Sequence, residues 1–193
     1  GYKTIGIGKV LHGAKKNDPI SWTRPFVTED DLEYNKNHNR PTDGQYQNKT
    51  TRKTLTSINN ASKKIKNIRK ELAIRNARPA TECLDLPDNA YVDGAVAAKS
   101  IDILKQLHKE ETPFFMTVGF RKPHLPFNAP KKYWDLYGRQ KIPLPKHSEH
   151  PVNSPDWATR SWRELEGYTD IPGDGEITEA KVRELRHGYY ACV

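Results

Sequence analysis

The sequence predicts an α/β fold in which a mostly parallel sheet is flanked by helices. Three observations predict it: a short apolar strand at residues 2–10, two helical periods in the middle of the chain, and a nearly continuous apolar run at residues 112–120. Such a run is typical of a strand buried on both faces in a parallel sheet that helices cover. The order strand, excursion, helix, helix, strand, helix then requires crossover connections.

The first strand holds Ile5, Ile7 and Val10, and the glycines between them permit close backbone approach. From residue 15 to about residue 53 the chain is polar and rich in turn-forming proline, asparagine and glycine. This stretch is predicted to be a long surface excursion.

Apolar residues that recur three or four positions apart predict three helices. The first is marked by Ile58, Ala61, Ile65, Ile68 and Leu72, and its opposite face carries Lys63, Lys64, Lys66, Arg69 and Lys70. The second runs from about residue 92 to 109, with Val92, Ala95, Val96, Ile103 and Leu107 on its apolar face. The last is indicated by Ile177, Ala180, Leu185, Tyr189 and Cys192.

Composition excludes several classes of protein. The 193 residues carry a formal net charge of +8, and the mean hydropathy is −0.89. No apolar run approaches the ~18 residues of a membrane span. Cys83 and Cys192 lie far apart, so they predict neither a disulfide framework nor a zinc site.

The chain opens on a strand without Met or signal peptide and stops within a helical period, so we interpret it as an internal fragment.

Two segments each place a lysine and a histidine directly after a predicted strand. They are residues 8–12, with Lys9 and His12, and residues 121–127, with Lys122 and His124. Sites of α/β proteins are usually built at the carboxyl ends of strands. A site of these four side chains would be cationic and would contain two groups that move protons near neutral pH. It would suit an anionic ester.

The same residues are open to other interpretations. Either segment alone is also typical of a solvated loop. Residues 6–9 are not a phosphate loop, because the GxxxxGK spacing is absent and Val10 replaces the required Ser or Thr. The basic residues 63–78 invite a nucleic-acid partner, but no aromatic residue lies between Tyr46 and Tyr91 for base stacking. A solvated helical face is favoured, and no nucleic-acid partner is expected.

Taken together and in order, the two segments resemble the sulfatase family. Residues 1–12 look like the family's strand that leads into a GK-x-x-H loop, and residues 114–127 resemble the strand and loop of its leaving-group histidine. The KPHxPF form of residues 122–127 is particularly like iduronate-2-sulfatases. The resemblance continues at residues 130–137 and 186–193, and it implies an alkaline-phosphatase-like fold of which residues 1–193 would be the central part, truncated at both ends.

The resemblance also implies roles for five residues. Lys9 and His12 would face the sulfate and a formylglycine nucleophile, and His124 would protonate the departing sugar oxygen, which is worth roughly 100-fold or more in rate. Arg121 and Lys122 would bind a uronate carboxylate or a neighbouring sulfate. The family forms formylglycine in a C/S-x-P-x-R motif and holds Ca²⁺ on acidic residues. Neither cysteine lies in such a motif and no Asp-His-Gly metal segment occurs, so we predict no metal ligands here and no turnover by these residues alone.

The expected activity of the complete protein is therefore hydrolysis of a sulfuric ester on a sulfated sugar or polysaccharide. One alternative is a phosphate or phosphonate ester hydrolase of the same superfamily. Another is a non-enzymatic polyanion-binding protein that uses residues 63–78. By the same resemblance the protein would be exported to the periplasm, the extracellular space or the lysosome.

Overall fold

The computed structural model describes residues 1–12, 19–32, 34, 46–65, 67–147, 149, 151–159, 164–173 and 175–193. These residues belong to two compact units, one of residues 1–37 and 86–124 and the other of residues 38–85 and 125–193. Each unit has a pair of parallel strands with helices packed against it, which confirms the predicted α/β class. That residues 1–193 are the central part of one catalytic domain stays a prediction.

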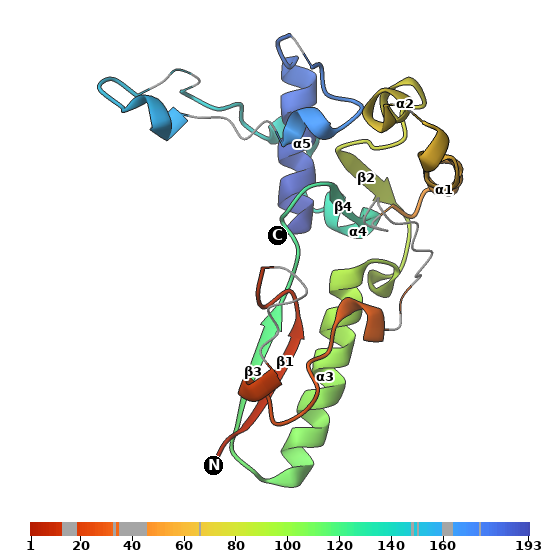
Figure 1. The fold of residues 1–193 in the computed structure, drawn as a ribbon. Coiled ribbons are helices and arrows are strands. Elements are labelled where there is room, and N and C mark those ends of the chain that lie inside the picture. Colours follow the sequence, from red (N-terminus) through yellow and green to blue (C-terminus); the bar gives the residue numbers. More distant parts are fainter. Residues whose placement is uncertain are drawn as a thin grey trace. The chain divides into compact units, whose positions relative to one another are not determined.

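The first unit is built on strands β1 (Lys3–Gly8) and β3 (Phe114–Gly119). They pair in parallel, with Lys3 opposite Phe114 and Gly8 opposite Gly119. Helix α3 (Val92–Glu110) runs alongside this pair (Figure 1) and buries its predicted apolar face against it. Ile5 and Ile7 form the centre of this core, each at most 1% exposed.

The other edge of β1 is bordered by residues 23–27, part of the predicted surface excursion. Backbone hydrogen bonds join Thr23 N to Thr4 O, Val27 N to Gly6 O and Gly8 N to Val27 O, each 3.0 Å long. This border leads directly into the short 3₁₀ helix η3 (Glu29–Asp31); the preceding one is η2 (Pro19–Ser21). The described part of the excursion is thus integrated into the sheet unit.

The predicted burial of the apolar run on both faces is wrong. Met116 and Val118 pack against the core with α3, but Phe115 is 60% exposed and Phe114 is 38% exposed. Among the described residues β3 pairs with β1 alone and α3 covers one face. An apolar run indicates a strand, but burial depends on the neighbours that tertiary structure supplies.

The second unit is built on strands β2 (Thr81–Leu84) and β4 (Phe127–Pro130), which pair in parallel. The predicted last helix is confirmed as α5 (Glu179–Cys192), and it packs on both strands together with the short α4 (Lys131–Trp134). A Cβ at Gly188 of α5 would lie 2.8 Å from Cβ of Phe127, so glycine is needed for this close contact. The remaining short 3₁₀ helices are η5 (Asp88–Ala90), η6 (Arg139–Lys141), η7 (Asp156–Thr159) and η8 (Leu165–Gly167).

The single basic helix predicted around residues 58–78 is wrong. The chain forms α1 (Lys49–Asn60), the 3₁₀ helix η4 (Ser62–Lys64) and α2 (Ile68–Ile74) instead. The break has a local cause, because the side chain of Asn67 accepts a hydrogen bond from Lys70 N and starts a new helix. The apolar residues of the predicted helix still pack together, since Ile58 and Leu72 share one core with Ile65 and Ile68. Lys66 lies outside the described residues.

Candidate functional site

The carboxyl ends of β1 and β3 touch through two glycines. Lys9 N donates a hydrogen bond of 2.8 Å to Gly119 O. Gly8 has a φ of 77°, a value that L side chains rarely adopt. A Cβ at Gly119 would lie only 2.1 Å from Lys9 O. The segments that follow the two strands therefore begin next to each other at the same edge of the sheet.

All five predicted site residues lie in the two segments that follow these strand ends. Lys9 and His12 follow β1, while Arg121, Lys122 and His124 follow β3. Lys9, His12 and His124 are exposed, and Arg121 and Lys122 are partly buried. The structure thus brings the two segments to the same end of a parallel strand pair, and the chemical roles of the five side chains stay predictions.

The segment after β3 folds into a tight turn. His124 N donates a hydrogen bond of 3.0 Å to Arg121 O, and Lys122 Nζ donates one of 3.2 Å to His124 O. The peptide bonds Lys122–Pro123 and Leu125–Pro126, on either side of His124, are cis. The turn holds Lys122 and His124 close to the end of the strand.

Two carboxylates that the sequence did not single out contact this turn. Asp93, in the first turn of α3, accepts hydrogen bonds from Arg121 N at 3.0 Å and from Lys122 N at 2.7 Å. Glu29 of η3 forms an ion pair with Nε of Arg121. Asp93 looks like an ordinary acidic residue at a helix start, and Glu29 lies in the polar stretch without periodicity. Only the fold reveals their partners.

The described residues contain no group of three or more His, Cys, Asp or Glu side chains with the geometry of a metal site. Cys83 and Cys192, which are both described, do not form a disulfide. Among the helices described, none is long and apolar enough to cross a bilayer. The Ca²⁺ and formylglycine that the resemblance implies stay predictions.

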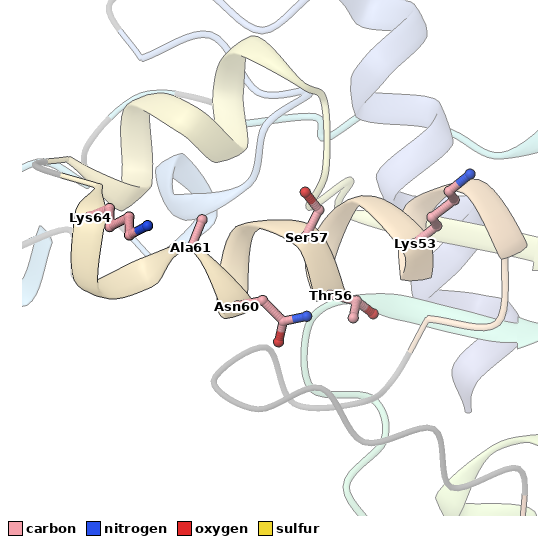
Figure 2. Close-up of a pocket in the computed structure, with 6 residues that line it drawn as sticks. All are labelled: Lys53, Thr56, Ser57, Asn60, Ala61 and Lys64. Carbon is pink, nitrogen blue, oxygen red and sulfur yellow. The ribbon is translucent and has the colours of Figure 1, made fainter.

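A second candidate surface lies on α1 and η4 in the other unit. It is an open depression of about 600 Å³ along the outer face of α1, with lysines at its two ends (Figure 2), lined by Lys53, Thr56, Ser57, Asn60, Ala61 and Lys64. Lys63, Lys64 and Lys70 are exposed. This agrees with the predicted solvated basic face, and the depression contains none of the five predicted site residues.

Comparison with known proteins finds several sulfatases that resemble this chain. Over its full length the chain is 28% identical to iduronate 2-sulfatase of Homo sapiens and covers 32% of that protein. It is 35% identical to a sulfatase of Formosa agariphila over 97 residues, which are 47% of this chain and 18% of that protein. An arylsulfatase of Clostridium perfringens is 27% identical over 55% of this chain and 20% of its own length. No protein-family model matches the chain.

The chain resembles sulfatases. It spans about a third of the length of the iduronate 2-sulfatases that it matches, 32% in each case. The parallel α/β arrangement of both units agrees with the alkaline-phosphatase-like fold that a resemblance to sulfatases implies.

Proposed function

We propose that this chain is part of a sulfatase that hydrolyses a sulfuric ester on a sulfated carbohydrate. The observation that carries the proposal is the joined ends of β1 and β3, where Lys9 N bonds to Gly119 O. Two segments that each carry a lysine and a histidine start there, and their motifs resemble those of sulfatases. The similarity to sulfatases over the full chain supports the same activity.

Each side chain has a task that follows from its chemistry. The ammonium group of Lys9 is a compact positive charge that neutralises an oxygen of the ester sulfate. His12 takes up or releases a proton beside the sulfate, because its imidazole ring offers both a donor and an acceptor nitrogen. His124 donates a proton to the bridging oxygen as its bond to sulfur breaks, so that the sugar leaves as an alcohol rather than as an alkoxide. An oxygen nucleophile, which is water in the net hydrolysis, forms the new bond to sulfur.

Arg121 and Lys122 are proposed to bind a second anionic group of the substrate, such as a carboxylate or a neighbouring sulfate. The ion pair of Arg121 Nε with Glu29 fixes this guanidinium at the edge of the turn. A substrate anion would therefore meet its two terminal nitrogens. The relatives named iduronate 2-sulfatase support a sulfated uronic acid as this substrate.

Formylglycine and Ca²⁺ are the groups that the resemblance implies for the complete enzyme. The described residues do not fit either one, because no metal-ligating cluster is found among them and neither cysteine lies in a C/S-x-P-x-R motif. No step of the proposal runs through these groups. An exported location is proposed on the resemblance alone.

The test is to compare the release of sulfate and of phosphate by the full-length protein that contains these residues. Matched substrates are one sugar carrying either a sulfate or a phosphate ester at the same hydroxyl. A kcat/KM at least tenfold higher for the sulfate ester is expected. A preference for the phosphate ester would favour the phosphatase alternative. Salt-sensitive binding of polyanions without hydrolysis of either ester would favour the binding protein and overturn the proposal.

A further inference from the structure

The turn that carries Lys122 and His124 is held by a carboxylate from another element. Asp93 accepts two hydrogen bonds, one on each oxygen, from Arg121 N at 3.0 Å and from Lys122 N at 2.7 Å. Hydrogen bonds to an ionised acceptor are roughly twice as strong as neutral ones. One side chain therefore fixes two consecutive peptide units of the turn.

Asp93 is itself fixed by the packing of its helix. Its neighbours Val92 and Ala95 are buried, at 7% and 3% exposure. A Cβ at Gly94 would lie 2.0 Å from Asp88 O, so glycine lets η5 close against the start of α3. The first turn of a helix also favours a negative charge, because the peptide dipoles point their positive ends there. The carboxylate is thus held in place before any substrate arrives.

We propose that Asp93 is a positioning residue that sets the orientation of His124 toward the leaving group. The connection is short: Asp93 holds the amides of Arg121 and Lys122, and the carbonyl of Arg121 accepts the hydrogen bond from His124 N. The inference rests on the proposed sulfatase function, in which His124 donates the proton. It adds a residue outside both lysine–histidine segments to the functional site.

A positioning role differs from a purely structural role in its dependence on the leaving group. A sugar alkoxide is a strong base and needs the proton from His124, whereas a nitrophenolate leaves readily without it. Misplacing the proton donor therefore slows sugar sulfates strongly and nitrophenyl sulfate little. A loss of folded protein lowers both rates by the same factor.

The experiment measures kcat/KM of the full-length protein on a sulfated monosaccharide and on 4-nitrophenyl sulfate. The variants are Asp93→Ala and Asp93→Asn, whose amide oxygen can accept only one of the two hydrogen bonds. The matched control is Ser100→Ala, which removes the buried 2.7 Å hydrogen bond from Ser100 Oγ to Val96 O within the same helix. His124→Ala provides the reference pattern for loss of the proton donor.

For Asp93→Ala we expect a loss of about 100-fold on the sugar sulfate and less than about 3-fold on the aryl sulfate, with Asp93→Asn between it and wild type. Ser100→Ala should lower both rates equally. Equal losses on both substrates, or no loss, in the Asp93 variants would overturn the inference. If Asp93→Ala does not fold, the near-isosteric Asp93→Asn carries the same comparison. Wild-type protein that releases no sulfate from either substrate would overturn the proposed function, and this inference with it.

Discussion

Replacing Gly119 by alanine perturbs the point where the two strand ends meet. The new Cβ would lie 2.1 Å from Lys9 O, 2.2 Å from Lys9 C and 2.5 Å from Val10 N. Because non-bonded carbon atoms pack at about 3.5–4.0 Å, the two chains must separate by roughly 1 Å. All three atoms belong to the backbone, so no side-chain rotation relieves the clash. The 2.8 Å hydrogen bond from Lys9 N to Gly119 O must lengthen or break.

The expected loss in the free energy of unfolding follows from these two effects. Forcing an extra methyl group into a packed site costs about 1–3 kcal/mol, and losing one backbone hydrogen bond costs about 1 kcal/mol. We therefore expect Gly119→Ala to lower the free energy of unfolding by about 2–4 kcal/mol. The segments of Lys9 and His124 both start at this point. A displacement of about 1 Å between them should lower the proposed sulfatase activity about 100-fold.

Gly138→Ala is the matched control. Its Cβ would meet no atom closer than 3.6 Å, and that atom belongs to the flexible side chain of Lys141. The φ of Gly138 is −76°, which alanine adopts readily, so the free energy of unfolding should change by less than about 0.5 kcal/mol. Denaturant unfolding and sulfate release of the full-length protein measure both effects. If Gly119→Ala behaves like Gly138→Ala in both assays, the close contact of the two strand ends determines neither stability nor activity.

Two further predictions concern carboxylates that stabilise each unit. Hydrogen bonds from Lys3 and Arg24 lower the pKa of Glu110 below its ordinary value of 4.5, so its stabilising effect is present above pH 4.5 and is lost as the pH falls further. Glu110→Gln should therefore lower the Tm at pH 7, and this difference from wild type should shrink below pH 4.5; a difference independent of pH would contradict the prediction. The side chain of Glu82, which is 7% exposed, accepts hydrogen bonds from Gln47 N at 2.7 Å and from Asn48 N at 2.9 Å. Both amides lie directly before α1. Glu82→Ala should lower the free energy of unfolding by roughly 2–4 kcal/mol in denaturant titrations, because two amides lose their acceptor; a change below about 0.5 kcal/mol would contradict this.

Elements with a sustained apolar pattern could be predicted from the sequence. The helix expected at residues 92–109 is observed as Val92–Glu110, and the two apolar strands pair in parallel as expected. Strands β2 and β4 could not be predicted, because each has four residues and pairs with a partner far away in the chain. The break between α1 and α2 could not be predicted, because the apolar spacing continues through it, whereas the N-cap at Asn67 begins a new helix.

The same distinction holds for the candidate site. A parallel sheet places the ends of its strands together, so a Lys–His pattern after each strand is enough to predict that Lys9 and His124 start from one edge. The contributions of Asp93 and Glu29 could not be predicted in this way. Asp93 acts on backbone amides, which every residue has, and Glu29 reaches Arg121 only because residues 23–27 border β1. Contacts of this kind leave no pattern in the sequence.

We propose that Lys9, His12 and His124 form one site for a sulfuric ester. The most direct test measures kcat for sulfate release from a sulfated sugar by the full-length protein and by Lys9→Ala, His12→Ala and His124→Ala. All three side chains are exposed, so the variants should keep the circular dichroism spectrum and Tm of the wild type. We expect each substitution to remove most of the activity, with a loss of about 100-fold or more for His124→Ala. Unchanged turnover in all three variants would contradict the claim.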